Sequence, residues 1–426
     1  MMRVALRDAA AKRAGRGRSG NRTPEKMKNA ANLVIAQSGG PSMVINETLV
    51  GAVLAARGAG KAVGKVLGAR HGIDGVLKGD FIDLKRPSEA FLERIAKTPS
   101  SALGSCRHKP TPEDCDRILE ALLSRGAGFF LYIGGNDSAD AARLVAERAA
   151  ARGAPLRVVH VPKTIDCDLR GNDHTPGYGS AGRFVACALR GDDLDNRALG
   201  GVKIDVVMGR DAGFLTAASA LARERPDDGP HLVYLPERPF SMPRFAADVK
   251  AVLARLGRCV VAVSEGIRDA RGTLIAAKFS TERDSHGNLQ LSGTGALGDL
   301  LAGEIKRRLG VKRVRADTFG YLQRTFPGIA SETDAAEARA VGAEAVRHAL
   351  AEAAAGAPVA ASTIRIVRAK GRAYRVSFEA APVQTVAKDT RRLPDEFIAP
   401  AGNDVTPAFV AWARPLLGPL PPCEVF

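Results

Sequence analysis

Several features that define whole classes of protein are missing from this sequence. Its six cysteines are scattered, without a C-x-x-C pair, which argues against a zinc site and against a disulfide framework. No run of about 18 apolar residues is present, so we expect no membrane span. Aromatic residues make up 5% of the chain, so stacking platforms for single-stranded nucleic acids are poorly supplied. We therefore predict a cytoplasmic protein that binds neither a membrane nor a nucleic acid.

Positive charge, in contrast, is abundant, with 62 Lys and Arg against 46 Asp and Glu. Much of the excess falls in residues 1–31, which we expect to form a basic, disordered tail; an Arg-rich organellar transit peptide is the alternative. The remaining excess favours acidic partners, either nucleic acids or small phosphorylated substrates. Charge alone does not separate these two classes.

Short apolar runs that end in glycine or polar residues recur from residue 32 onward. Residues 33–36 lead into Ser38-Gly39-Gly40, and residues 129–133 lead into Gly134-Gly135. The segments between such runs have the pattern of amphipathic helices. Strands that alternate with helices predict an α/β fold with mostly parallel, doubly wound sheets. Ligands of such sheets bind at the carboxyl ends of the strands, so we expect these loops to converge on one cleft.

Two glycine-containing turns are candidate phosphate sites. Gly39 and Gly40 precede a helix expected over residues 43–56, and backbone N–H groups at a helix start bind phosphate well. A plain tight turn is the alternative. In the segment Gly-Gly-Asn-Asp-Ser at 134–138, Asn136 and Asp137 stand where another helix begins, and there the plainer interpretation is a helix N-cap.

The strongest local signal is Pro-Lys-Thr-Ile-Asp-Cys-Asp at residues 162–168. Phosphoryl transfer to a hydroxyl needs a carboxylate that takes the proton, and Asp166 and Asp168 offer two. It also needs Mg²⁺, which carboxylates and waters hold. Lys163 adds a cation able to stabilise charge on the transferring oxygens. A solvated acidic turn is the alternative.

Arginines near other strand ends suit a sugar phosphate, because a guanidinium binds phosphate through two parallel hydrogen bonds. The candidates are Arg107, Arg210, Arg315 and Arg324. Taken singly, each is better explained as a surface residue. Glu265 offers a carboxylate for sugar hydroxyls, with a helix cap as the alternative.

In this order, the motifs resemble those of the phosphofructokinase family over roughly residues 32–330. The matching segments are the Gly39-Gly40 turn, Leu-Gly-Ser-Cys-Arg at 103–107, the 134–138 and 162–168 segments, Met-Gly-Arg at 208–210, Ser-Glu-Gly at 264–266 and Tyr-Leu-Gln-Arg at 321–324. The resemblance implies two Rossmann-like domains, with residues 32–177 binding the donor and residues 178–325 binding fructose 6-phosphate. Residues 326–426 are expected to form a small C-terminal extension, with a helix, a hairpin and a tail that pack back on the core.

The resemblance also implies a role for individual residues. Asp166 is expected to accept the proton of the sugar 1-hydroxyl, Arg107 to contact the transferring phosphate, and Gly40 to contact the donor. The other expected substrate-binding residues are Thr164, Ile165, Met208, Gly209, Arg210, Glu265, Tyr321 and Arg324. Arg315 and, more loosely, Lys203 resemble residues that reach the sugar 6-phosphate across a subunit contact. We therefore expect a homodimer, with a homotetramer as the alternative.

Donor choice is expected to depend on two positions. Where Asp137 stands, ATP-using members of the family carry glycine, which leaves room for the α-phosphate. A carboxylate there fills that space and repels the anion. ATP-using members also tend to have a small residue at the position of Lys163, whose ammonium takes over charge stabilisation here. Together the two residues favour pyrophosphate as the donor.

One position departs from the family pattern. An Asp that helps to hold Mg²⁺ is usual where this chain has Asn136. The neutral carbonyl oxygen of Asn136 is a weaker but acceptable ligand, so we still expect Mg²⁺ there, directly or through water.

The sequence thus predicts reversible transfer of a phosphoryl group from pyrophosphate to the 1-hydroxyl of fructose 6-phosphate. The products are fructose 1,6-bisphosphate and phosphate, in glycolysis or gluconeogenesis. The alternatives are the same fold using ATP, or a non-catalytic phosphosugar-binding protein.

Overall fold

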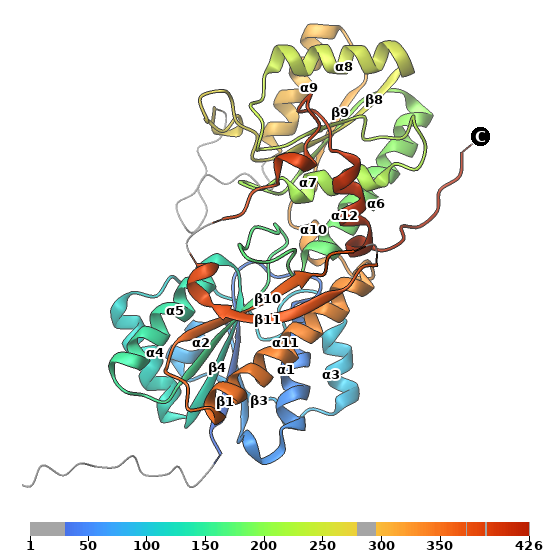
Figure 1. The fold of residues 1–426 in the computed structure, drawn as a ribbon. Helices are drawn as coiled ribbons and strands as arrows, with labels where there is room; N and C mark the ends of the chain where they lie inside the picture. Colours follow the sequence, from blue (N-terminus) through green and yellow to red (C-terminus); the bar gives the residue numbers. More distant parts are fainter. Residues whose placement is uncertain (1–29, 279–294, 372, 388–389, 426) are drawn as a thin grey trace, which may run out of the picture.

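The computed structural model describes residues 30–278, 295–371, 373–387 and 390–425. Apart from Ala30 and Ala31, the predicted tail lies outside the described residues. The described chain forms two lobes, each built on one sheet with helices on its faces (Figure 1). The predicted class, α/β with mostly parallel sheets, is confirmed.

Seven strands form the sheet of the first lobe, in the order β11-β10-β5-β4-β1-β2-β3. Neighbouring strands are parallel except at the two edges, where β2–β3 and β10–β11 are antiparallel. The central strands are almost entirely buried apolar runs, as expected for strands that are covered on both faces. The strands are β1 Asn32–Gln37, β2 Val66–Ala69, β3 Phe81–Asp83, β4 Ala127–Gly134, β5 Arg157–Pro162, β10 Ala361–Arg368 and β11 Val376–Pro382.

Helices cover both faces of this sheet because neighbouring side chains of a strand point to opposite faces. Leu33 and Ile35 of β1 pack with α1, α3 and α11, whereas Val34 and Ala36 pack with α2, α4 and α5. The helices are α1 Ile45–Gly58, α2 Ile73–Lys78, α3 Glu89–Ala96, α4 Pro112–Ser124, α5 Asn136–Ala151 and α11 Glu332–Ala354.

Four parallel strands form the sheet of the second lobe, in the order β7-β8-β6-β9. Helices α6, α7 and α12 pack on one face, and α8 and α9 pack on the other. No helix of the described residues has the length and apolarity that a bilayer span needs. The elements are β6 Gly201–Val207, β7 Leu232–Tyr234, β8 Arg258–Ser264, β9 Val314–Thr318, α6 Tyr178–Leu199, α7 Phe214–Ala218, α8 Met242–Leu256, α9 Ala296–Leu309, α10 Leu322–Thr325 and α12 Pro407–Leu417.

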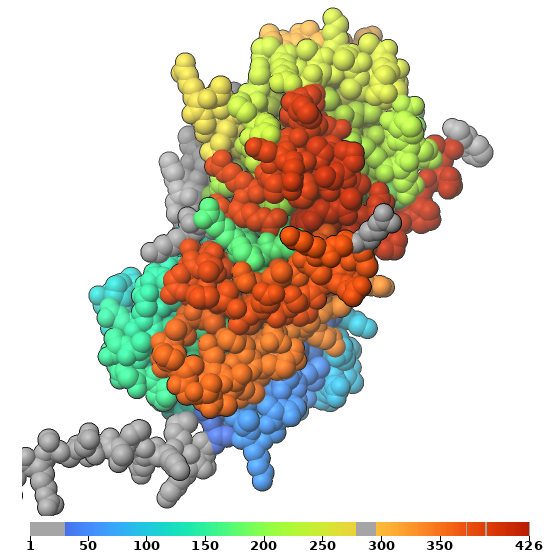
Figure 2. All heavy atoms as spheres, viewed as in Figure 1, coloured from blue at the N-terminus to red at the C-terminus, as the bar shows by residue number. Residues whose placement is uncertain are grey.

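The C-terminal region contributes to both lobes and runs across them in Figure 2, where it is coloured orange to red. Strand β10 continues the first sheet beside β5, and α12 packs on α6 of the second lobe. Asp334 of α11 is buried and accepts hydrogen bonds from the backbone N–H groups of Gly177 and Ser180, at 2.8 and 2.9 Å. Helix α11 therefore caps the start of α6, which fixes one lobe to the other.

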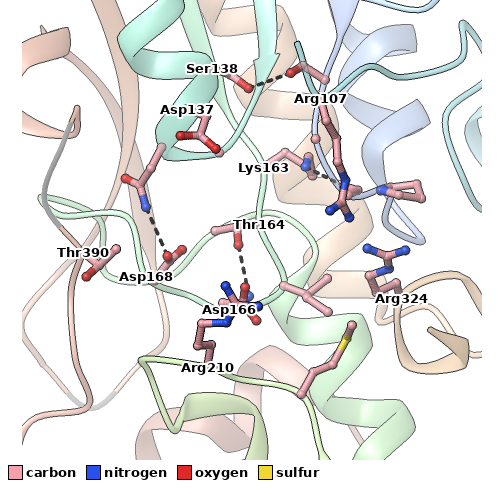
Figure 3. A pocket seen from close by; sticks show the side chains of 18 of the residues that line it. Arg107, Asp137, Ser138, Lys163, Thr164, Asp166, Asp168, Arg210, Arg324 and Thr390 are labelled. Atoms are coloured by element: carbon pink, nitrogen blue, oxygen red, sulfur yellow. Dashed lines mark hydrogen bonds between the residues drawn. The ribbon is translucent and has the colours of Figure 1, made fainter. Parts of the chain in front are cut away.

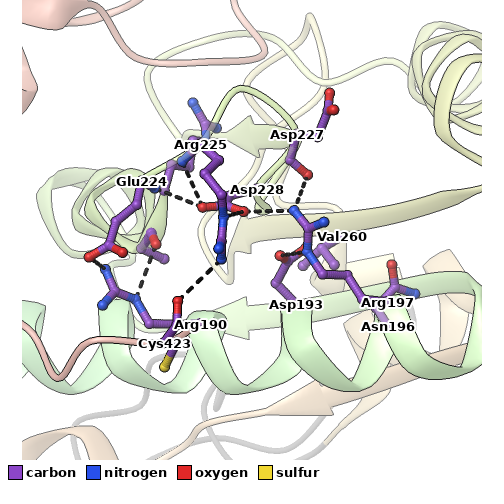
Figure 4. Close-up of polar contacts among 12 residues, drawn as sticks. Arg190, Asp193, Asn196, Arg197, Glu224, Arg225, Asp227, Asp228, Val260 and Cys423 are labelled. Carbon is purple, nitrogen blue, oxygen red and sulfur yellow. Dashed lines mark hydrogen bonds and ion pairs between the residues drawn. The ribbon is translucent and has the colours of Figure 1, made fainter. Parts of the chain in front are cut away.

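An ion-pair network fixes the far half of α6 within the second lobe (Figure 4). Arg197 contacts Asp193 at 3.0 Å and Asp228 at 2.6 Å, and Arg258 of β8 also pairs with Asp193. Asp193 and Asp228 are buried. Buried carboxylates are tolerated when they are paired in this way, so the network sets the position of α6 against the loop before β7.

Candidate active site

A cleft of about 700 Å³ lies where the strand ends of the two sheets face each other. Its walls come from the loops after β1, β4 and β5 of the first lobe and after β6, β8 and β9 of the second. Residues 106–109 and Thr390 complete the lining. The structure brings most of the predicted site residues together in its lining: Gly39, Gly40, Arg107, Asn136, Asp137, Lys163, Thr164, Ile165, Asp166, Met208, Arg210, Glu265, Tyr321 and Arg324. Gly209 lies between two lining residues but does not line the cleft itself.

The Gly39-Gly40 turn lies further from its helix than the sequence suggested. Helix α1 begins at Ile45 rather than at residue 43, so the turn is a loop and not the first helical turn. Gly39 has φ of +74°, a conformation that favours glycine. A Cβ on Gly40 would lie 2.7 Å from Nη1 of Arg324. The turn is thus shaped so that cations of the cleft approach its backbone closely.

Lys163 follows β5 and extends under this turn. Its side chain is buried, and its Nζ donates to the Gly40 carbonyl at 2.6 Å. Burial, together with the neighbouring Arg324 charge, lowers the pKa of Lys163 to about 8. Because this ammonium bonds to a neutral carbonyl, it can still form an ion pair with an anionic ligand.

Asp166 and Asp168 lie on the loop that Lys163 begins. The intervening Cys167 has φ of +58°, so the loop is not extended there. Burial raises the pKa of Asp166, although Arg324 and Lys163 oppose this shift. Burial, together with the Asp166 charge, raises the pKa of Asp168 to about 7. A carboxylate whose pKa is raised toward neutrality is better suited to accept a proton than an ordinary one.

Cationic side chains surround these carboxylates in Figure 3. Lys163 lies at the centre, Arg107 and Arg324 lie on one side of it, and Arg210 lies near Asp166. Burial lowers the pKa of Arg324, and the Arg107 charge contributes to the shift. The guanidinium of Arg324 also lies 4.5 Å from the centre of the Tyr321 ring. Several cations gathered in one cleft are the environment that binds a phosphate anion.

The predicted helix cap at Asn136 or Asp137 is not formed. Helix α5 begins at Asn136, and its N-cap is Gly135 without a side-chain cap. Asn136 instead donates from Nδ2 to Oδ2 of Asp168 at 3.1 Å. Its Oδ1 is buried and has no hydrogen-bond partner among the described residues. A lone amide oxygen beside a carboxylate fits a hard cation such as Mg²⁺.

Asp137 lines the cleft on the first turn of α5, and its side chain is mostly exposed. Its Oδ1 lies 3.0 Å from Nζ of Lys109. The carboxylate predicted to repel a nucleotide phosphate is therefore paired with a cation, so part of its charge is neutralised. Exposed pairs of this kind contribute little to stability. The bulk of Asp137, which α5 fixes, is consequently as important as its charge.

The second lobe supplies the opposite wall through residues 208–210 and 264–266. Ser264 Oγ donates to the Gly209 carbonyl at 2.6 Å, and the Gly209 N–H lies 3.4 Å from Oε1 of Glu265. A Cβ on Gly266 would lie 2.0 Å from the Arg210 carbonyl oxygen. These contacts hold Met208, Arg210 and Glu265 at one rim of the cleft.

Lys203 and Arg315 lie outside the cleft of their own chain. They face each other in register on β6 and β9. Arg315 is exposed. Lys203, in contrast, contacts Asp317 through its Nζ. The same Nζ lies 3.3 Å from Oδ1 of Asp192 and 3.8 Å from Oδ1 of the buried Asp205. We call Lys203 and these three aspartates the β6 cluster. Contact of Lys203 and Arg315 with a substrate therefore requires a second subunit, which stays a prediction.

Several lining residues were not singled out as site residues from the sequence. Lys109 lies two residues after the motif that ends at Arg107, so its position in the chain was a usable signal. Asp211 and Arg268 pair at 2.7 Å across the loops after β6 and β8. Thr390 comes from the C-terminal region, far along the chain, and no local pattern marks it.

The phosphofructokinase family model matches residues 32–349 of the chain. The pyrophosphate–fructose 6-phosphate 1-phosphotransferase of Rhodospirillum rubrum is 53% identical over 388 residues, which cover 91% of this chain and 94% of the relative. The enzyme of the same name from Xanthomonas campestris is 41% identical over 395 residues, with 91% of each chain covered. A crystal structure of a pyrophosphate-dependent phosphofructokinase from Nitrosospira multiformis has a TM-score of 0.81 at 31% identity, covering 92% of this chain and 94% of that chain.

Proposed function

Because this chain belongs to the phosphofructokinase family, we propose that it is the enzyme that moves a phosphoryl group between pyrophosphate and fructose 6-phosphate. The forward reaction consumes pyrophosphate and fructose 6-phosphate and yields fructose 1,6-bisphosphate and phosphate. The observation that carries the proposal is the buried Lys163 beside Asp166, in a cleft that both lobes line. The names of the relatives support the same reaction.

Asp166 is the proton acceptor in this proposal. Its carboxylate takes the proton of the 1-hydroxyl as the sugar oxygen attacks the phosphorus of pyrophosphate. The bond from that phosphorus to the bridging oxygen breaks, and phosphate leaves. The Arg324 and Lys163 charges limit the rise in pKa that burial causes at Asp166. Proton transfer by a positioned side chain typically contributes a factor of about 10²–10⁴ to a rate.

Lys163, Arg107 and Arg324 stabilise the charge on the transferring phosphoryl group and on the leaving phosphate. Mg²⁺ would neutralise further charge on the donor, and Asn136 and Asp168 would hold it through the orphaned amide oxygen and the adjacent carboxylate. Met208, Arg210, Glu265 and Tyr321 are assigned to fructose 6-phosphate, together with Gly209, Thr164 and Ile165 near the reacting hydroxyl. In this scheme the first lobe binds the donor and the second lobe binds the sugar.

Donor selection is assigned to Asp137 and Lys163. Asp137 narrows the space beyond the transferring phosphate, where a nucleotide would place its α-phosphate. Lys163 stabilises the negative charge on pyrophosphate as its phosphoryl group is transferred. We propose a cytoplasmic enzyme, which agrees with six free cysteines.

A homodimer completes the site in this proposal. Arg315 presents an exposed cation to a neighbouring subunit, with Lys203 beside it in register on β6. Apolar side chains are exposed at Leu199, Leu322 and Phe326, which suits burial against a second copy. Arg315→Ala should raise KM for fructose 6-phosphate about tenfold with a small change in kcat. Mixed with Asp166→Asn subunits, it should recover activity; no recovery would place Arg315 outside a shared site.

Phosphorus NMR of the purified protein with pyrophosphate, fructose 6-phosphate and Mg²⁺ tests the reaction. We expect the pyrophosphate signal to be replaced by equal amounts of phosphate and of fructose 1,6-bisphosphate 1-phosphate. Adding the products should regenerate pyrophosphate. Release of two phosphates without sugar phosphorylation would show a simple pyrophosphatase and would contradict the proposal.

A further inference from the structure

The segment of residues 104–110 forms part of the donor wall, yet it is neither helix nor strand. Three consecutive basic residues in it, Arg107, His108 and Lys109, all line the cleft. The segment is anchored at its start, where the Cys106 carbonyl accepts from Gly39 N–H at 3.0 Å. For residues 107–110, the described part of the chain shows no backbone–backbone hydrogen bond. The position of Arg107 therefore depends on side-chain contacts.

His108 makes two such side-chain contacts. Its Nδ1 lies 2.7 Å from Oδ1 of Asp74 on α2, and its Nε2 lies 3.0 Å from Oδ2 of Asp114 on α4. One ring thus bridges two helices of the first lobe, with Arg107 and Lys109 directly beside it in the chain. Arg117 of α4 lies 3.5 Å from the other oxygen of Asp114 and completes the charged groups around the ring.

We propose that His108 is a positioning residue of the donor site, which holds the Arg107–Lys109 segment against the cleft while its ring is protonated and releases it when the proton is lost. The proposal rests on the proposed function, because pyrophosphate is the ligand whose binding it affects.

The chemistry of the ring supports this dependence on the proton. Both ring nitrogens face carboxylate oxygens, and only the imidazolium form donates from both. A neutral ring keeps one donor and turns a lone pair toward the other carboxylate, so one of the two contacts is lost. Loss of the proton also changes the net charge of His108, Asp74 and Asp114 from −1 to −2 beside the anion site. Looser positioning and added negative charge both weaken pyrophosphate binding.

The sign of the pH dependence follows from the same contacts. The hydrogen bond to Asp74 raises the pKa of His108, and the bond to Asp114 adds to the shift, although burial opposes it. The bridge is therefore complete below the ordinary histidine pKa and is lost as pH rises through the raised value. Pyrophosphate affinity should decline over that interval.

The test is steady-state kinetics of the full chain with pyrophosphate across the neutral pH range. For the wild type, KM for pyrophosphate should rise with pH. The side chain of His108→Gln does not titrate, so KM of this variant should not change with pH. At the acidic end its KM should be about tenfold above that of the wild type, with a much smaller change in kcat. His348→Gln is the matched control, since His348 pairs with Glu352 within α11 and does not line the cleft. It should keep the wild-type profile.

A second measurement keeps the inference testable should His108→Gln fail to fold. Saturating pyrophosphate should raise the pKa of His108 in histidine-ring NMR of the wild type, because binding and protonation are reciprocally linked. Asp74→Asn should move the rise in KM to lower pH. A His108→Gln profile parallel to the wild type, or a His108 pKa unmoved by pyrophosphate, would overturn the inference. Wild-type protein inactive with pyrophosphate would overturn the proposed function as well.

Discussion

Two groups of lysine and aspartate in this molecule contain the same residue types, but the pKa of the lysine is shifted in opposite directions. In the β6 cluster, burial opposes the charge of Lys203, but direct contact with Asp317 and the nearby Asp205 and Asp192 outweighs it and raises the pKa of the lysine. In the cleft, Lys163 bonds to a backbone carbonyl instead, and burial lowers its pKa to about 8.

The difference lies in what each group still lacks. The β6 cluster has one lysine among three carboxylates, so its lysine is already satisfied within the chain. The cleft has Lys163, Arg107 and Arg324 around Asp166 and Asp168, so it has positive charge to spare. A site that stays short of negative charge in the folded protein is prepared for an anionic ligand, whereas a satisfied ion cluster is not.

Removing the proposed proton acceptor, Asp166, should have the largest effect on kcat. Asp166→Asn should lower kcat by about 10²–10⁴ while the protein stays folded, because the amide cannot take the proton. The matched control is Asp192→Asn in the β6 cluster, which should leave kcat unchanged. Rate measurements on both variants give the change in kcat, and circular-dichroism melting curves show whether each variant is folded. A near-normal rate for Asp166→Asn would remove this residue from the role of base.

Neutralising the two lysines should separate their roles. Lys163→Met should lower kcat by about 10²–10³, the usual cost of losing one contact to developing charge. Lys203→Met should instead leave kcat unchanged, because its ammonium is already paired with Asp317 and Asp192 within the chain. Equal effects of the two substitutions on kcat would erase the distinction between the two groups.

The pH profile gives a smaller but more specific effect. Since the pKa of Lys163 is lowered to about 8, its charge is complete below that pH and is lost above it. The kcat of the wild type should therefore decline through about pH 8. A guanidinium does not titrate there, so Lys163→Arg should move this decline to higher pH even if it is slower overall. An unchanged midpoint in Lys163→Arg would assign the decline to another group.

Much of this arrangement could be predicted from the sequence, because the strand ends are marked by local patterns. Parallel strands covered on both faces give short apolar runs, and the residues after them meet at one edge. Contacts made across the chain are not marked in this way. Thr390 in the cleft and Asp334 at the start of α6 come from the C-terminal region, and contacts between distant segments determine their positions: Thr390 pairs with Leu169, and Asp334 accepts from Gly177 N–H.

Local patterns also gave wrong predictions where tertiary contacts determine the hydrogen-bond partner of a side chain. A polar residue at a helix start predicts a cap, but Asn136 donates to Asp168 and leaves the cap position to Gly135. His108 has no recognisable motif, and its partners lie on two different helices. The charge of Asp137 could be read from the sequence, but its pairing with Lys109 could not.

Substitution of Asp137 should have the smallest effect on the normal reaction and the clearest effect on donor choice. Asp137→Gly should shift the ratio of kcat/KM for ATP and pyrophosphate toward ATP by about tenfold or more, because it opens the space that the α-phosphate needs. Lys109→Ala is the matched variant, since it removes the partner of Asp137 and keeps the carboxylate. An Asp137→Gly protein that still does not use ATP would place the block elsewhere in the cleft.

The most direct measurement compares the two donors in one assay of the unmodified protein, with fructose 6-phosphate and Mg²⁺ held constant. With an ammonium at position 163 and a carboxylate at position 137, turnover is predicted with pyrophosphate and not with ATP. Turnover with ATP and none with pyrophosphate would contradict the account.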